Sequence, residues 1–340
     1  MFNVCAALQE FYDTHVRLGN ERRQALAGHR DANLKRLSDG LTALKNEGRV
    51  KCGPYAKSYT QGSFAMHTLN QHADNDYDID VGVLFEEYCL PSSALDSRNL
   101  VAEALVKAGG NFAKDPESRT NAVTVWYSEG HHVDFAVYRR RKTAAGLVVL
   151  EHASTDWRTQ DPLDVQTWFD DRVQKLSPSA GSGRVPSGQL RRIIRFAKAF
   201  TRSRDSWSLP GGMITSALTV ECYKPDAYRD DAALHNTLAA LSSRLSASTA
   251  VRNPVEGTSW LTSKTEHENQ VKRMRDRLSE NMPKLAVLFG ADCTEYQARS
   301  AWDWVFNHSY WRETPAAKTQ RADERAAIGA IDIRVDVAFQ

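Results

Sequence analysis

The sequence lacks most of the features that mark membrane-bound, secreted or nucleic-acid-coating proteins. It contains no run of about 18 apolar residues, so no membrane span is expected. Its first residues carry no basic flank followed by an apolar segment and small residues, so no secretory signal is visible. The net charge is only +2, which argues against coating nucleic acid through bulk charge. These absences predict a cytoplasmic protein with no strong DNA-binding signal.

Cysteine is scarce, odd in number and scattered along the chain. No two cysteines form a C-x-x-C pair, and the five lie at Cys5, Cys52, Cys89, Cys222 and Cys293. Such isolated residues predict reduced thiols, with neither a disulfide framework nor a zinc site.

The residues that are present have an ordinary globular composition, with 41% hydrophobic and 25% charged side chains. Leucines spaced three and four apart over 34–44 predict a helix in the N-terminal part of the chain. β-rich runs predict strands, and helical patterns dominate from about residue 160 onward. The strand candidates are IDVGVLF at 79–85, AVTVWYS at 122–128, HVDFAVY at 132–138 and LVVLE at 147–151.

This order of elements predicts an α+β fold with two lobes. Residues 1–160 would form N-terminal helices and a lobe built on a mixed or antiparallel sheet, and residues 161–330 a helical lobe. The last ten residues, 331–340, alternate apolar and polar like a strand. They either begin a truncated domain or close the sheet.

Two of the strand candidates carry carboxylates on one face. Period-two alternation in DIDVGV places Asp78 and Asp80 together, opposite apolar side chains, and HVDFAV presents Asp134 in the same way. If the two strands are neighbours, three carboxylates meet on one surface. Such a site suits two Mg²⁺ or Mn²⁺ ions that serve phosphoryl transfer. Taken alone, D-x-D fits a solvated edge strand better, because the tripeptide is common.

A glycine-serine turn precedes the first acidic strand. In Gln61-Gly62-Ser63, the glycine lets backbone amides approach a phosphate and the Ser63 hydroxyl can donate to one. The structural alternative is a plain turn entering a short helix, with Ser63 as its N-cap. The order Gly-Ser, then D-x-D, then a further carboxylate in an apolar strand is more specific than any one of its parts.

This constellation resembles the polymerase-β-type nucleotidyltransferase superfamily and, within it, the bacterial cGAS/DncV-like nucleotidyltransferases. TQGSFAMHTLN followed by YDIDVGV is similar to that family's glycine-serine loop and metal-binding strand, and HVDFAVY to its third-carboxylate strand. DPLDVQTWFDD, QLRRIIRFAKAFTRSRDSW and PGGMITSALTV are similar to its helical-lobe segments, in the same order. The resemblance spans about residues 55 to 225.

The resemblance implies a bilobal polymerase-β-like fold that makes cyclic di- or trinucleotides from NTPs, ATP and/or GTP. The product would be a second messenger of bacterial anti-phage defence (CBASS). It assigns Asp78, Asp80 and Asp134 to catalysis and to two Mg²⁺ or Mn²⁺ ions. It also assigns Gln61, Gly62 and Ser63 to the triphosphate. The zinc insertion that binds DNA in animal cGAS has no Cys/His counterpart in this sequence, so no zinc is expected.

Basic residues recur at helical spacing beside an apolar face, at Arg191, Arg195, Lys198 and Arg202. A cationic stripe of this kind can hold triphosphates in a cleft. For Arg191 and Arg202, a solvated helix face is an equal alternative. Lys198 is the stronger candidate, because FAKAF resembles the family position that reaches nucleotide phosphate or ribose. His131 and His132 are strand neighbours that point apart and make a poor metal pair.

The sequence therefore predicts a nucleotidyltransferase that forms a cyclic product. One alternative is a linear transferase acting on RNA or a protein acceptor, for which the near-neutral charge offers no extended basic surface. Another is a catalytically inactive nucleotide sensor, which would gain nothing from three mutually repelling carboxylates. Base choice, linkage, ring size and oligomeric state are not predicted.

Overall fold

The computed structural model describes residues 1–72, 77–178 and 188–313. The expected strand-like tail at 331–340 lies outside the described residues, as does most of the Ser/Gly/Pro-rich stretch around 180. None of the described helices is both long enough and apolar enough to cross a membrane.

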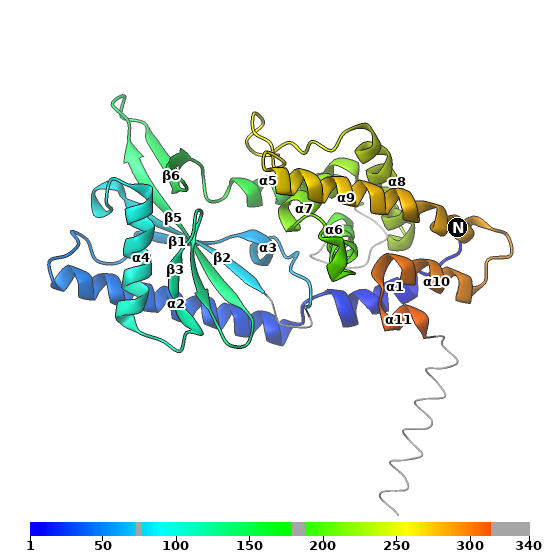
Figure 1. Ribbon diagram of the computed structural model, residues 1–340, viewed down its shortest axis with the longest axis horizontal. Helices are drawn as coiled ribbons and strands as arrows, with labels where there is room; N and C mark the ends of the chain where they lie inside the picture. The colour runs from blue at the N-terminus through cyan, green and yellow to red at the C-terminus, as the bar shows by residue number, and fades with distance from the viewer. Residues whose placement is uncertain (73–76, 179–187, 314–340) are drawn as a thin grey trace, which may run out of the picture.

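A mixed sheet forms one lobe (Figure 1). Its central order is β1-β2-β5-β4-β3, and β6 extends from the far half of β5 and pairs in turn with β7. β2 and β5 run parallel, and the other pairs are antiparallel. The predicted α+β class is confirmed. The strands are β1 (Lys57–Thr60), β2 (Asp78–Glu86), β3 (Lys114–Ser118), β4 (Val123–Trp126), β5 (His132–Lys142), β6 (Val148–Ala153) and β7 (Trp157–Thr159).

Two helices cover the apolar face of this sheet. They are α2 (Asn20–Asn46), which runs along the whole lobe, and α4 (Ala94–Ala108) (Figure 1). Their leucines and valines form one buried core with the alternate, apolar residues of β2, β4 and β5. Gly40 permits the close crossing of the two helices, since a Cβ there would overlap the backbone of Ala104. The carboxylates expected on β2 and β5 are therefore left on the opposite face.

Helices form the second lobe around a separate core. Apolar residues from the start of the chain, among them Leu8 and Phe11, belong to this helical core. Residues 1–160, which were expected to form the sheet lobe, therefore contribute to both hydrophobic cores. The helices are α1 (Cys5–Phe11), the π-helix η1 (Tyr12–Val16), α5 (Asp164–Leu176), α6 (Gln189–Thr201), α7 (Gly212–Cys222), α8 (Asp230–Ala247), α9 (Thr265–Asn281), α10 (Glu295–Phe306) and α11 (Ser309–Arg312), with 3₁₀ turns η3 (Asp205–Trp207) and η4 (Met282–Phe289).

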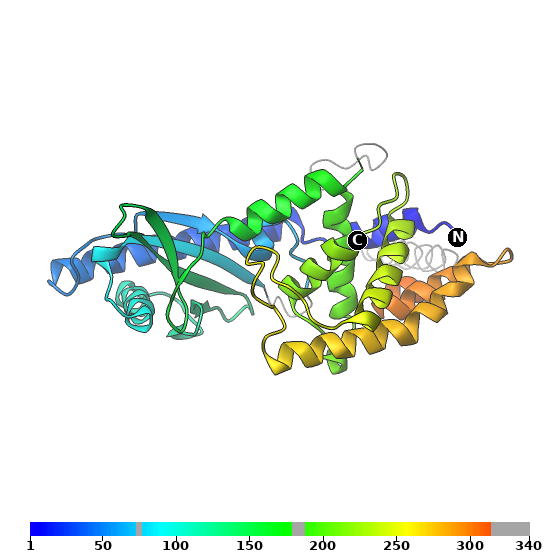
Figure 2. The ribbon, with the colours of Figure 1, turned by 90° about the horizontal axis from the view of Figure 1, so that it is seen from above.

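The two lobes lie side by side along the long axis of the molecule, and α5 leads from one to the other (Figure 2). Helix α6 holds the segment that follows the short helix α3 (Gly62–Ala65) of the sheet lobe. Arg191 Nε donates to the carbonyl of Met66 at 2.9 Å, and Asn70 Nδ2 donates to the carbonyl of Arg195 at 2.8 Å. These contacts bring the basic helix beside the acidic strands.

The expectation of five reduced cysteines is wrong for two of them. Cys52 and Cys89 form a disulfide with a Cα–Cα distance of 5.2 Å. Cys52 precedes β1, and Cys89 lies in the 3₁₀ turn η2 (Glu87–Cys89) that follows β2. Because β1 pairs antiparallel with the end of β2, these two segments meet in space. No short sequence spacing could indicate this, since 37 positions separate the two residues.

Candidate active site

The parallel pair β2–β5 brings the expected carboxylates together. In register, Asp78 lies opposite His132 and Asp80 opposite Asp134. The side-chain period of two puts all four on the face that α2 and α4 leave uncovered. Their apolar neighbours Ile79 and Val133 are fully buried on the other face. The condition for a shared acidic site, that the two strands be neighbours, is met.

Two side chains contact these carboxylates. His132 Nε2 lies 2.8 Å from Asp78 Oδ1 and 3.5 Å from Asp134 Oδ2. Thr124 of β4 donates its hydroxyl to Asp134 Oδ1 at 2.5 Å. The sequence predicts no role for Thr124, and for His132 only a poor metal pair with His131. Only the position of His132, two residues before Asp134 on the same face, could have indicated these contacts.

The pKa values of the carboxylates reflect crowding. Burial, followed by repulsion from Asp134 and Asp78, raises the pKa of Asp80 to about 7. Burial also raises the pKa of Asp134, although the Thr124 hydrogen bond works against it. Burial acts on Asp78 in the same direction, but the hydrogen bond and charge of His132 outweigh it and leave the pKa of Asp78 lowered. A cation placed among these oxygens would relieve the repulsion, so the donor set fits Mg²⁺ or Mn²⁺.

The present side-chain arrangement is not that of a closed metal site. Within residues 1–72, 77–178 and 188–313, no three His, Cys, Asp or Glu side chains converge to hold a metal ion. The imidazole of His132 lies between Asp78 and Asp134.

The glycine-serine turn lies directly against the acidic strand. Gly62 has a φ of 63°, and a Cβ at this position would overlap the carboxylate of Asp80. Ser63 lies inside the first turn of α3, whose N-cap is Gln61, so the N-cap alternative for Ser63 is wrong. A turn with positive φ packed on a carboxylate requires glycine.

Gln61 has a connecting role. Its backbone amide donates to the carbonyl of Asp80 at 2.8 Å. Its side-chain nitrogen donates to the carbonyl of Pro162 at 2.6 Å and to the hydroxyl of Tyr138 at 3.2 Å. The amide therefore ties the start of the helical lobe to the sheet, and its assignment to the triphosphate remains a prediction.

Lys198 is buried next to the same turn. Its Nζ donates to the carbonyl of Thr68 at 2.8 Å and lies beside Gly212 of α7. Burial, followed by the charges of Arg202 and Arg195, lowers the pKa of Lys198 to about 7, against the pull of Asp78 and Asp80. The side chain therefore lies within the electrostatic reach of the carboxylates. Its contact with a nucleotide remains a prediction.

The other basic residues of this stripe differ in their exposure. Arg191 and Arg195 are buried, and Arg195 donates to the hydroxyl of Tyr12 at 2.8 Å. A solvated helix face is therefore wrong for Arg191, whose Nη2 also donates to Asp170 at 2.9 Å. Arg202, at the end of the helix, is exposed.

Comparisons with known proteins agree with this geometry. Residues 56–138 match the family described as cyclic GMP-AMP synthase DncV-like, nucleotidyltransferase domain. That segment runs from the start of β1 through the glycine-serine turn and both acidic strands. Residues 56–138 are therefore similar to the nucleotidyltransferase domain of that family.

Solved structures of similar fold cover nearly the whole chain. The Vibrio cholerae DncV cyclic AMP-GMP synthase with nonhydrolyzable GTP aligns with a TM-score of 0.69 at 17% identity, over 92% of this chain and 98% of that one. The same synthase with the linear intermediate 5′ pppA(3′,5′)pG also gives 0.69, at 18% identity, over 93% and 98%. CdnC of E. coli MS115-1 with ATP gives 0.63 at 15% identity, over 90% and 98%. At these identities the likeness establishes the fold, so the nucleotidyltransferase domain and its helical lobe share the architecture of these enzymes.

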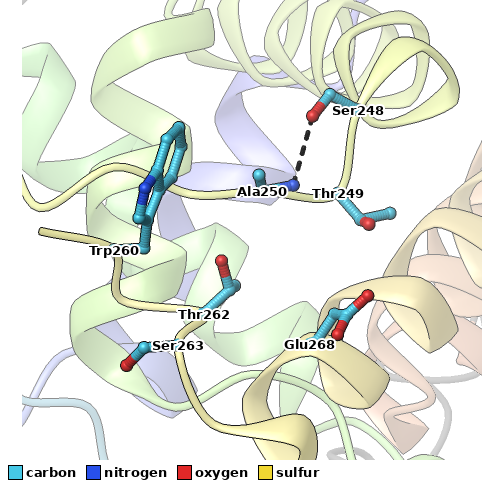
Figure 3. Close-up of a pocket in the computed structure, with 7 residues that line it drawn as sticks. All are labelled: Ser248, Thr249, Ala250, Trp260, Thr262, Ser263 and Glu268. Atoms are coloured by element: carbon cyan, nitrogen blue, oxygen red, sulfur yellow. Dashed lines mark hydrogen bonds between the residues drawn. The ribbon is translucent and has the colours of Figure 1, made fainter.

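A hollow lies in the helical lobe, between the end of α8 and the start of α9 (Figure 3). It has a volume of 510 Å³ and is lined by Ser248, Thr249, Ala250, Trp260, Thr262, Ser263 and Glu268. Two of its hydroxyls already accept backbone amides: Ser248 from Ala250 at 3.2 Å and Thr262 from Val251 at 3.0 Å. Its lining contains none of the carboxylates of the nucleotidyltransferase domain.

Proposed function

We propose that this protein condenses NTPs into a cyclic di- or trinucleotide by two-metal-ion phosphodiester formation. The observation that carries the proposal is the register of β2 and β5, which sets Asp80 opposite Asp134 beside the Gly62 turn. Partly buried carboxylates held together against their mutual repulsion support a cation-binding role.

The chain's own residues divide the work as follows. Asp78 and Asp80 would hold the ion that arrives with the triphosphate, and Asp134 would hold the second ion and accept the proton of the attacking ribose hydroxyl. Gly62 and Ser63 receive the triphosphate, and Lys198 contacts a phosphate or ribose. When bound, the ions lower the hydroxyl pKa and neutralise charge on the departing pyrophosphate. The hydroxyl attacks the α-phosphate in line, and a second round on the linear intermediate closes the ring.

ATP and GTP are the proposed substrates. The support comes from the similar structures, which hold GTP, ATP or a linear A–G intermediate. We extend the proposal to a cytoplasmic second messenger of bacterial anti-phage defence. The Cys52–Cys89 disulfide is unusual for a reducing compartment, so the redox state of these two cysteines tests the cytoplasmic part of the proposal.

The test is incubation of the purified protein with each NTP and each NTP mixture, with Mg²⁺ or Mn²⁺, followed by mass spectrometry of the products. We expect a product that lacks free 5′-phosphates and resists phosphatase. Only linear products, or extension of an added RNA or protein, would favour the linear transferase. NTP binding without pyrophosphate release would favour the inactive sensor.

A further inference from the structure

Thr124 lies in the same row of the sheet as two of the carboxylates. The register pairs Asp80 with Asp134 across β2 and β5, and Asp134 with Thr124 across β5 and β4. The three side chains thus stand side by side on one face. On β4, the two residues that flank Thr124 are fully buried valines on the other face.

The environment of Thr124 requires a partner for its hydroxyl. Thr124 is 1% exposed, so its hydroxyl is out of reach of bulk water. A buried hydroxyl without a hydrogen bond costs about 1–3 kcal/mol. Valine has nearly the same shape and would fill the position without that cost. The chain nevertheless carries threonine, and the hydroxyl donates to Asp134 Oδ1.

Because of that hydrogen bond, the two carboxylate oxygens of Asp134 have different neighbours. Oδ1 is taken by Thr124, and Oδ2 faces His132 and, through it, Asp78. A carboxylate rotates readily about its last bond unless something holds its plane. Asp134 is the only one of the three proposed metal-binding carboxylates to which the described residues give a hydroxyl donor.

We propose that Thr124 is a positioning residue that fixes the plane of the Asp134 carboxylate, reserving Oδ1 for the sheet and presenting Oδ2 to the cation and the attacking hydroxyl. The inference rests on the function proposed above. Residues that orient metal ligands act through the ligand, and their removal typically costs about 10–100-fold in metal affinity or activity. Thr124 itself touches neither nucleotide nor metal.

The test compares Thr124→Val, which removes the hydroxyl, with Thr124→Ser, which keeps it. Thr219→Val is the matched control, because Thr219 is equally buried in α7 and its hydroxyl donates to the carbonyl of Thr215 at 2.7 Å. Binding of Mn²⁺ alone is measured by electron paramagnetic resonance. Pyrophosphate release is measured against metal concentration and against NTP concentration.

We expect Thr124→Val to weaken Mn²⁺ binding or to raise the metal concentration needed for half-maximal rate by about 10–100-fold. Its KM for NTP at saturating metal should stay near that of the wild type, and Thr124→Ser and Thr219→Val should behave like the wild type. A Thr124→Val protein with unchanged metal binding and unchanged metal dependence would overturn the proposal. So would an equal loss in Thr219→Val, which would indicate a general packing effect.

Two further outcomes have a defined meaning. If Thr124→Val does not fold, Thr124→Ala replaces it, and equal metal binding by the Ala and Ser variants overturns the proposal. If the wild type releases no pyrophosphate from any NTP, the proposed function fails. The Mn²⁺ titrations of the four proteins then still decide whether Thr124 orients Asp134.

Discussion

The acidic face of β2–β5 and the basic helix α6 each gather charges of one sign, but the partners of these charges differ. On α6, Arg191 donates to Met66 and Asp170, Arg195 to Tyr12 and Lys198 to Thr68. Each of these cations has oxygen acceptors in the protein, and the bonds to the carbonyls of Met66 and Thr68 join α6 to the segment that follows α3. The buried cations of α6 therefore already have hydrogen-bond acceptors within the protein, and they also contribute positive electrostatic potential at the site.

The carboxylates of the acidic face have fewer partners in the described part of the protein. Asp78, Asp80 and Asp134 stand together, and the described partners of their side chains are His132 and Thr124. The raised pKa of Asp80, about 7, shows that burial and like charges oppose its ionisation. This difference between paired cations and crowded carboxylates indicates that the two regions contribute differently to stability and to function. Changes to Arg191 and Arg195 should cost folding, changes on the acidic face should cost chemistry, and changes to Lys198 should cost both.

The largest effect on activity is expected from Asp78→Asn together with Asp80→Asn. Removing two of the three carboxylates should abolish product formation. The free energy of unfolding at neutral pH should change little, because relief of the repulsion at Asp80 offsets loss of the Asp78 contact with His132. Mass spectrometry of products and thermal unfolding are the measurements. Asp115→Asn, an exposed acid on β3, is the control. Wild-type turnover by the double variant would refute the proposed active site.

Asp134→Asn should affect nucleotide binding and bond formation to different extents. Asp134 comes from a separate strand, so the variant should still bind NTP·Mg²⁺ almost normally but lose bond formation. Calorimetry with a non-hydrolysable NTP measures the first property, and pyrophosphate release measures the second. Loss of both together would show that Asp134 also holds the ion that accompanies the nucleotide.

Gly62→Ala should reduce activity strongly, because the new Cβ overlaps Asp80 and the positive φ is strained for alanine. We expect a stability loss of about 1–3 kcal/mol and a larger proportional loss of turnover. Gly28→Ala is the control, since a Cβ at Gly28 meets nothing within 4 Å. Denaturant unfolding and steady-state kinetics compare the two. Equal behaviour of the variants would mean that the turn does not have to pack on the carboxylate.

Lys198→Ala and Ser63→Ala should weaken NTP use, each by about 1.5–3 kcal/mol if the side chains bond to phosphate. Only Lys198→Ala should also lower the melting temperature, because it removes the bond to Thr68 between the lobes. The rate is measured against NTP concentration, and stability by thermal unfolding. An unchanged NTP dependence in both variants would leave the two residues with structural roles alone.

The smallest effect on activity is expected at the other end of β2. The Cys52–Cys89 disulfide lies beyond Glu86, whereas the site begins at Asp78. The Cys52→Ser, Cys89→Ser variant should therefore retain turnover but lose about 2–4 kcal/mol of stability in oxidising buffer. Turnover and denaturant unfolding are measured with and without reductant. Thiol titration of the unfolded wild type that finds five free thiols would contradict the disulfide.

Local patterns were sufficient to predict much of the fold. Alternation in DIDVGV and HVDFAV correctly separated the buried valines from the carboxylates, because a strand fixes the side-chain period whatever its neighbours are. The leucine spacing over 34–44 correctly predicted a helix, now seen as α2. The helical character after residue 160 is confirmed as well.

Contacts between distant segments could not be predicted in this way. His132 and Thr124 contact carboxylates only because β5 lies between β2 and β4 in a particular register. The disulfide depends on the meeting of two strand ends, and the buried state of Arg191 depends on the docking of two lobes. Apart from the placement of His132 two residues before Asp134, none of these contacts has a sequence spacing that identifies it.

The sequence by itself determined which residues share a face, where helices and strands form, and which chemistry three carboxylates and a glycine turn can support. The tertiary structure decided that Asp80 and Asp134 stand opposite each other, that Thr124 and His132 hold two of the carboxylates, and that the cations of α6 already have partners. The physical reason is the separation along the chain of the residues that determine each feature. Backbone geometry repeats over two to four residues and can be read locally, whereas register, lobe docking and side-chain partners depend on contacts between segments far apart in the chain.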